Sequence, residues 1–101
     1  MKQKSGPLSV FGEWLRKKRY RKGMTLRDLS EKSGLNLTTL VKWEKGRIWT
    51  PRISKIKQLA VALELSPETI FEVIDDSKKI LERMRVMRLE RSINRGKNDN
   101  G

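Results

Sequence analysis

The hydrophobic residues of this chain recur at the spacing of amphipathic helices, and polar caps, glycines and prolines mark the ends of each segment. Ser9 is placed to cap a first helix that runs to about Lys22, and Gly23 follows as a C-terminal glycine. The apolar side of this helix carries Phe11, Trp14 and Leu15. Residues 1–9 include two lysines, a glycine and a proline, and we expect them to form a flexible basic arm.

A short second helix is predicted before a glycine turn. Thr25 is a good N-cap, and Asp28 stands three residues later, which is a short version of the capping box. The helix is expected to reach about Ser33. Gly34 then follows where the chain must turn sharply, and glycine adopts a left-handed backbone conformation at the lowest cost.

The third predicted helix, which Asn36 caps and Gly46 closes, has one apolar side and one mixed side. Leu40 and Trp43 are three residues apart and are expected to face the core. The outward side is expected to carry Leu37, Thr38, Val41, Lys42 and Lys45. Two short helices joined by a tight turn form the unit in which one helix holds a second in a DNA major groove.

Two further helices are predicted from a cap followed by proline at the first helical position. The fourth starts at Thr50 and Pro51, and its buried side is expected to carry Ile53, Ile56, Leu59, Ala60 and Leu63. The fifth starts at Ser66, Pro67 and Glu68, and its inward side is expected to carry Ile70, Phe71 and Ile74.

A separate sixth helix is predicted to begin at Asp75 and Asp76 and to reach about Ser92. Its apolar arc is broad, with one stripe of Ile80, Met84 and Met87 and another of Val86, Leu89 and Ile93. No strand pattern and no internal repeat is found in the sequence. The fold class is therefore all-α, with a flexible arm at 1–9, a five-helix domain at 10–74, a C-terminal helix at 75–93 and a disordered tail at 94–101.

The charge of the chain favours a polyanionic partner. The sequence carries 24 Lys and Arg against 12 Asp and Glu, which gives a formal net charge of +12. Residues 1–22 hold eight basic and one acidic residue, so much of the excess lies toward the N-terminal end. Nucleic acid is the expected partner of so basic a small domain.

Several other classes of function are disfavoured by the composition. The chain has no cysteine and no histidine, so we expect no disulfide, no metal centre, no cofactor and no nucleophile–base pair, and hence no enzyme. No apolar run approaches the roughly 20 residues of a membrane helix, and the basic start is not followed by a signal core. A membrane-surface role is also disfavoured, because Gly6 and Pro7 break the basic arm, so we expect a cytoplasmic protein.

Residues 10–74, about two thirds of the chain, resemble the Cro and lambda-repressor type of helix-turn-helix domain, also called the XRE family. The residues that carry the resemblance are Leu15, Arg16, Arg19, Thr25, Leu29, Ser30, Gly34, Leu35, Leu40, Trp43, Glu44, Gly46, Pro51 and the segment IKQLAVALEL before Ser66 and Pro67. Ser30 occupies a position where the family prefers alanine, because the second and third helices pass closely there. The resemblance also implies that Arg19 and Glu44 form a structural ion pair between the first helix and the end of the third.

The resemblance implies which residues meet DNA. The base-contacting positions correspond to Leu37, Thr38 and Lys42, with Asn36, Thr39 and Val41 near the groove. Lys42 can donate to guanine, Thr38 can pair with several bases, and Leu37 can pack on a thymine methyl group. Backbone contacts are expected from Thr25, Arg27, Lys45, Arg47 and Arg52.

One position departs from the family pattern. Leu26 stands where the family very often places a glutamine that grips a phosphate, although the position remains beside the DNA backbone. Leu26 and Leu37 together could instead be exposed leucines of a protein-binding surface, or could cover each other.

The basic run at 16–22 and the C-terminal helix leave further alternatives open. Most lysines in the run are expected to be solvated, Arg16 is a candidate phosphate contact, and Tyr20 is expected to pack at an edge. Trp49 lies in a loop and is expected either to fold over the fourth helix or to join an interface. With Trp49, the stripe of Ile80, Met84 and Met87 is a candidate homodimer interface that sets half-sites about 10 base pairs apart, or it packs on its own domain.

The predicted function is therefore a sequence-specific regulator of transcription that binds double-stranded DNA, more consistent with repression than with activation. One rival is an antitoxin or adaptor whose C-terminal helix binds a protein partner. Another is an architectural or RNA-binding protein that binds through charge alone, without regard to sequence. Its affinity for any specific site would be little higher than its affinity for random duplex.

Overall fold

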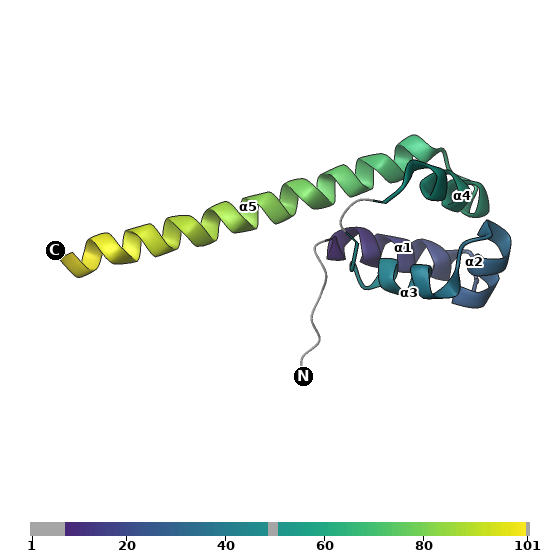
Figure 1. Ribbon diagram of the computed structural model, residues 1–101, viewed down its shortest axis with the longest axis horizontal. Coiled ribbons are helices and arrows are strands. Elements are labelled where there is room, and N and C mark those ends of the chain that lie inside the picture. The colour runs from purple at the N-terminus through teal and green to yellow at the C-terminus, as the bar shows by residue number, and fades with distance from the viewer. Residues whose placement is uncertain (1–7, 49–50, 101) are drawn as a thin grey trace.

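The computed structural model describes residues 8–48 and 51–100, with side chains described as far as Leu89, and these residues form five α-helices (Figure 1). The helices are α1 (Ser9–Arg21), α2 (Leu26–Ser33), α3 (Leu37–Glu44), α4 (Ile53–Leu63) and α5 (Pro67–Asn100). Helix α1 packs against α3 and α5, α2 packs against α3 and α4, and α4 packs against α5. The predicted all-α fold class is confirmed.

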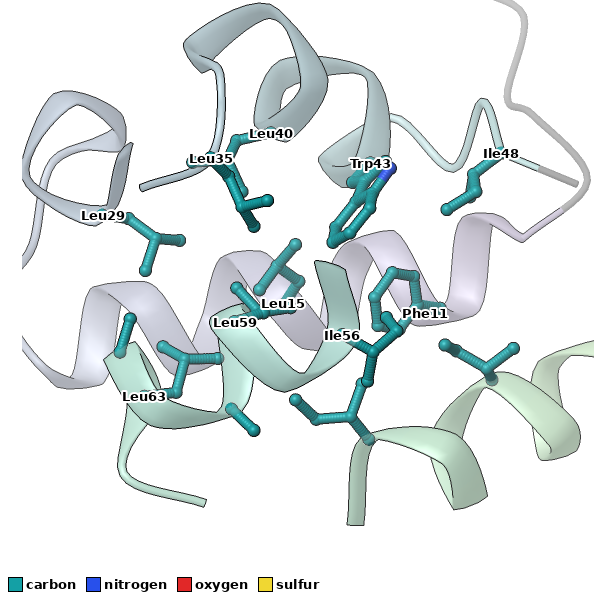
Figure 2. Close-up of a cluster of buried hydrophobic side chains, with 14 of the residues drawn as sticks. Phe11, Leu15, Leu29, Leu35, Leu40, Trp43, Ile48, Ile56, Leu59 and Leu63 are labelled. Carbon is teal, nitrogen blue, oxygen red and sulfur yellow. The ribbon is translucent and has the colours of Figure 1, made fainter. Parts of the chain in front are cut away.

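A single apolar core holds the bundle together (Figure 2). Phe11 and Leu15 of α1 are fully buried and lie between the helix-turn-helix unit on one side and α4 on the other. The remaining core residues include Leu8, Leu29, Leu35, Leu40, Trp43, Ile48, Ile56, Leu59, Leu63, Ile70 and Ile74. Burying side chains of this size contributes about 1.5–3 kcal/mol each, and the core contains most residues of the predicted stripes together with Leu8, Leu35 and Ile48.

Residues 8 and 9, which are predicted from the sequence to lie in the basic arm, are part of the folded domain. Leu8 is 2% exposed, and its backbone N–H donates to the carbonyl of Gly46 at 3.0 Å. Ser9 is itself helical and provides no side-chain cap, since Leu8 occupies the capping position. The prediction of a flexible segment is therefore wrong for these two residues, because Leu8 is apolar and its burial in the core is favourable.

Helix α4 begins later than predicted. Its first helical residue is Ile53 and its N-cap is Arg52, so Pro51 precedes the helix and does not occupy its first position. Ile53 is 61% exposed and lies outside the core, contrary to the prediction. Ile53 falls in the predicted buried stripe because it lies three residues before Ile56. It is the first residue of the helix, however, and its side chain does not reach the core. Thr50 lies outside the described residues.

The separate sixth helix is absent, because α5 runs without a break from Pro67 to Asn100. Asp75 and Asp76 are exposed positions in the middle of this helix, and Asp75 lies 3.4 Å from Lys79 one turn later. No proline or glycine occurs between Glu68 and Arg95 to stop the helix. Residues 94–100, expected to be a disordered tail, are also helical, and the C-terminal half of α5 projects away from the bundle (Figure 1).

Neither a membrane-spanning helix nor a metal-binding group of side chains occurs in the described part of the chain. No helix within 8–48 and 51–100 is both long and apolar enough to cross a membrane. In the same residues, no three acidic, histidine or cysteine side chains are grouped in a way that could hold a metal ion.

Candidate nucleic-acid interface

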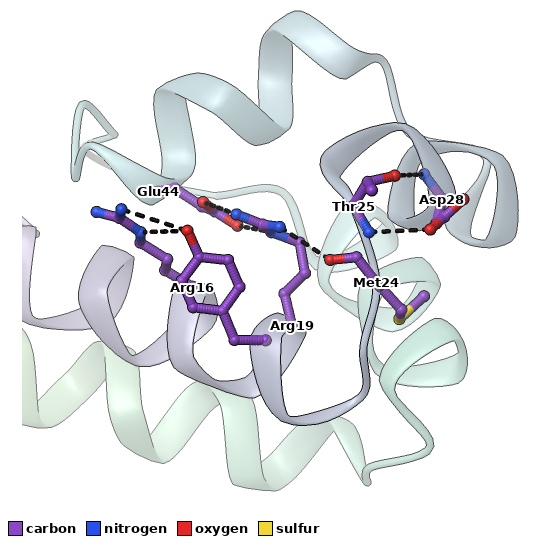
Figure 3. Close-up of polar contacts among 7 residues, drawn as sticks. Arg16, Arg19, Met24, Thr25, Asp28 and Glu44 are labelled. Atoms are coloured by element: carbon purple, nitrogen blue, oxygen red, sulfur yellow. Dashed lines mark hydrogen bonds and ion pairs between the residues drawn. The ribbon is translucent and has the colours of Figure 1, made fainter.

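The start of α2 is fixed by the predicted capping box (Figure 3). The backbone N–H of Asp28 donates to the Thr25 hydroxyl at 3.0 Å, and the N–H of Thr25 donates to the Asp28 carboxylate at 2.9 Å. The backbone hydrogen bond from Thr25, followed by its hydroxyl contact, lowers the pKa of Asp28 below its ordinary value. Two backbone donors are satisfied, which holds the first turn of α2 in place.

The turn between α2 and α3 is held from two sides. Gly34 has the left-handed conformation that the sequence predicts, with φ of 76°. Across the turn, the Ser30 hydroxyl donates to the Leu35 carbonyl at 2.6 Å. From α4, the Gln58 amide donates to the Ser33 carbonyl at 3.1 Å. The small residue at position 30 thus adds a hydrogen bond across the turn, and Gln58 is a positioning contact that helical periodicity alone does not reveal.

Helix α3 presents its predicted polar side to the exterior. Its buried side carries Leu40 and Trp43, which are 0% and 5% exposed. The exposed side chains are Leu37, Thr38, Lys42 and the following Lys45, while Thr39 and Val41 are partly buried. The predicted inward face is confirmed, and so is the exposure of four of the five predicted outward residues, whereas Val41 is partly buried. The contact roles of the outward residues stay predictions.

The N-cap of α3 is Asn36, whose side-chain oxygen accepts from the Thr38 backbone N–H at 3.0 Å. This bond uses one of the two acceptor positions of the amide oxygen, and the amide NH₂ group is the donor that Asn36 can offer to a groove. The cap also fixes the first turn of α3, where the candidate base-contacting residues Leu37 and Thr38 lie.

Arg19 and Glu44 form the ion pair that the resemblance implies (Figure 3). The Arg19 Nε and Nη2 atoms donate to the two carboxylate oxygens of Glu44 at 2.6 and 3.0 Å, and Nη1 donates to the Met24 carbonyl at 2.9 Å. Both side chains are 8% exposed. Hydrogen bonding to Glu44 raises the pKa of Arg19 further above its already high value. The pair ties α1 to the end of α3 and therefore sets the position of the exposed helix.

The candidate phosphate contacts lie at the start of α2, after the end of α3 and just before α4. Thr25, Arg27, Arg47 and Arg52 are all exposed. Leu26 is only partly buried but packs against the core, so the two leucines do not form an exposed pair. Leu37 alone is exposed, at 37%, which weakens the interpretation of this side as an apolar protein-binding surface.

Helix α1 holds a cluster that was not predicted from the sequence. Tyr20 accepts hydrogen bonds from Arg16, and the Arg19 guanidinium carbon lies 4.7 Å from the centre of its ring. The signal was the spacing of four between Arg16 and Tyr20, which places both on one helical face. Trp14 is partly buried and stacks on Phe11 with ring centres 6.1 Å apart.

The candidate dimer residues on α5 are exposed. Ile80, Met84 and Met87 are 39%, 54% and 56% exposed, so they do not pack back on their own domain. Trp49, the remaining candidate, lies outside the described residues.

Comparison with known proteins identifies the family. Residues 15–76 match the model of the Cro/C1-type helix-turn-helix DNA-binding domain. Over 63 residues the chain is 35% identical to the transcriptional regulator RghRB of Bacillus subtilis, an alignment that covers 62% of this chain and 45% of RghRB. The chain thus spans less than half the length of that relative.

Two solved structures have the same arrangement of helices. The biofilm master regulator SinR, crystallised in complex with DNA, has a TM-score of 0.57 and 26% identity over 60% of this chain and 97% of its own. The restriction-modification controller protein C.AhdI from Aeromonas hydrophila has a TM-score of 0.57 and 32% identity over 62% and 94%. The family is one of DNA-binding domains and not of enzymes. With its capped turn, its braced α3 and a family match over most of the bundle, this chain belongs to the Cro/C1-type helix-turn-helix family.

Proposed function

We propose that this protein is a sequence-specific regulator of transcription that represses by occupying a palindromic operator as a homodimer, with α3 in the major groove. One observation carries the proposal: α3 buries Leu40 and Trp43 while it leaves Thr38 and Lys42 exposed on the opposite side. A helix that is anchored on one side and polar on the other meets the geometric requirement of a recognition helix. The similarity to SinR, a regulator crystallised with DNA, supports the same role.

Base recognition is assigned to three residues of α3. The Lys42 ammonium donates to guanine O6 or N7, and the Thr38 hydroxyl donates to or accepts from a base edge. Leu37 packs on a thymine methyl group. Asn36, Thr39 and Val41 line the groove beside them, because Asn36 caps the same helix, the other two lie on it, and all three are exposed or partly buried.

Phosphate contacts position the helix without reading sequence. We assign them to the start of α2, to the end of α3 and to the residues before α4. The residues are Thr25, Leu26, Arg27, Lys45, Arg47 and Arg52. For Leu26 the contact is made by its backbone N–H, since its side chain packs against the core.

Dimerisation is assigned to the projecting part of α5. Ile80, Met84 and Met87 follow each other at spacings of four and three, which is the pattern of a helix-to-helix seam, and all are exposed. A second copy of the same helix covers them and places two α3 helices on half-sites about 10 base pairs apart, one helical turn. Occupying an operator in this way blocks polymerase with no further machinery, which favours repression over activation.

Binding sites selected from random duplexes test the proposal, followed by two substitutions on the selected site. Lys42→Ala should relax preference at one base pair by about 1–3 kcal/mol, whereas Arg47→Ala should weaken all sequences alike and lower the salt slope by about one. Selection that returns no preferred sequence, or equal effects of both substitutions, contradicts the assigned roles.

The exposed stripe on α5 also favours a second candidate, an antitoxin or adaptor in which this helix binds a different protein. Light scattering separates the two. A dimer of the purified chain that Met84→Asp converts to a monomer supports the repressor, while a wild-type monomer on specific DNA favours the second candidate.

A further inference from the structure

A surface depression of about 310 Å³ lies where α1 meets the start of α2 and the end of α3. A depression of this volume on the surface has room for a small charged group. Leu26 and Val41 line it together with Lys45. These three residues also belong to the proposed DNA-contacting surface, so the depression opens at the edge of that surface.

Some of the charged side chains around the depression form an ion pair and others do not. The Arg19–Glu44 pair is part of its lining, and each of its charges is neutralised by the other. Arg16 and Lys45 line it too, and among the residues the structure describes neither takes part in an ion pair. The depression therefore carries a net positive charge from two cationic side chains.

Tyr20 adds a hydroxyl group at the same place. It is 57% exposed and lines the depression. Its oxygen accepts from the Arg16 Nε and Nη2 atoms at 3.4 and 3.3 Å, so its own O–H is left to donate outward. The guanidinium groups of Arg16 and Arg19 lie 5.5 and 4.7 Å from the ring centre, which favours one orientation of the ring.

We propose that this depression binds one phosphate of the DNA backbone through the guanidinium of Arg16, the hydroxyl of Tyr20 and the ammonium of Lys45. The proposal rests on the proposed DNA-binding function and extends its contact set onto α1. An anionic tetrahedral group suits three donors that line one depression, two of which are charged.

The site places side-chain donors beside the start of α2, where Leu26 has none. Leu26 offers no side-chain hydrogen bond at the point where the helix begins, whereas Arg16 and Tyr20 reach the same depression from α1. Arg16 and Tyr20 are one helical turn apart and already in contact, so little side-chain entropy is lost when a phosphate binds between them.

Three single substitutions test the proposal, with the affinity of each variant measured for a duplex that carries the selected binding site. Arg16→Gln should reduce binding to all sequences alike, about tenfold at low salt, and lower the salt slope by about one. Tyr20→Phe removes only the hydroxyl and should cost about two- to tenfold in affinity, with the salt slope unchanged. Lys17→Gln is the matched control, because it removes the same charge from an exposed neighbour that does not line the depression, and it should have little effect.

A second measurement reports on the site itself, because Tyr20 is the single tyrosine of the chain. Hydrogen bonding and charge from Arg16 lower the pKa of Tyr20 in the free protein. A bound phosphate faces the phenol with negative charge and disfavours its ionised form, so duplex DNA should raise this pKa. NMR of isotope-labelled tyrosine follows the titration with and without duplex, and with inorganic phosphate in its place. The charged groups that face the phenol in this titration are Arg16, Arg19, Glu44 and Lys45.

The outcomes separate this proposal from the proposed function. If Arg47→Ala weakens binding as expected while Arg16→Gln, Tyr20→Phe and Lys17→Gln all bind alike, the phosphate site is wrong and the function stands. A Tyr20 pKa that duplex leaves unchanged, or that only inorganic phosphate shifts, also overturns the site. If the wild-type chain binds no duplex at all, the proposed function fails as well.

Discussion

Replacing Glu44 with alanine should destabilise the domain far more than the loss of an exposed charge. The substitution leaves the Arg19 guanidinium, in a side chain that is 8% exposed, without its carboxylate partner. Breaking a buried ion pair on one side costs about 3–5 kcal/mol in the free energy of unfolding. We expect the lower end, about 3 kcal/mol, because the Met24 carbonyl at 2.9 Å still accepts one hydrogen bond from Arg19. That loss corresponds to a fall in Tm of roughly 12–24 °C for a domain of this size.

Urea unfolding followed by tryptophan fluorescence measures the effect, with the double variant Arg19→Met and Glu44→Leu as the decisive comparison. Apolar replacement of both partners removes the orphaned charge, so the double variant should be clearly more stable than Glu44→Ala. Glu64→Gln is the control, since the Lys22–Glu64 pair is exposed and should contribute little. A Glu44→Ala variant as stable as the control, or a double variant less stable than the single one, would refute the reasoning.

Three further predictions concern packing, pH and salt. Gly12→Ala should cost about 3 kcal/mol by urea unfolding, because a Cβ there would lie 2.5 and 2.7 Å from two backbone carbonyl oxygens at the end of α3, which cannot move aside. The Thr25 N–H lowers the pKa of Asp28, so the ionised carboxylate stabilises the folded state. This contribution to the free energy of unfolding is present above the ordinary carboxyl pKa of 3.8 and is lost as the pH falls through the lowered pKa. The stability difference between the wild type and Asp28→Asn should therefore be constant near neutral pH and shrink in acid. Because Arg83 and Arg88 flank the apolar stripe of α5, light scattering should show dimerisation strengthening with added salt, while DNA binding weakens.

The parts of the fold that local chemistry decides could be predicted from the sequence. The Thr25 capping box, the left-handed Gly34 and the Asn36 cap each depend on residues within a few positions of one another, and the structure confirms all three. The buried faces of α3 and α5 follow from helical spacing in the same way. The Arg19–Glu44 pair joins residues 25 apart, so spacing could not reveal it, and the family resemblance supplied it.

The errors arose where packing overrides local preference. Asp75 and Asp76 favour a helix start, but they lie inside a helix that begins at Pro67, and no proline or glycine near them requires a break. Ser77 is 2% exposed, so this turn of the helix is packed within the domain, and its hydroxyl donates to the Val73 carbonyl one turn earlier in the same helix. The Tyr20 cluster was missed because a tyrosine within a basic run looks the same in sequence whether or not its neighbours turn toward it.

The absence of a break in α5 changes what the helix can do. If two helices met at Asp75, a flexible joint would let the projecting part turn relative to α3, and a dimer could adapt to several half-site spacings. In a continuous helix, successive side chains are rotated by about 100° per residue. The direction in which Met84 and Met87 point is therefore fixed relative to the buried residues Ile70 and Ile74 of the same helix. The orientation of any second copy on that stripe is then set by the same core that positions α3. Under the proposed function, the spacing of the two half-sites is thus determined by packing within one chain, and the operator must match it.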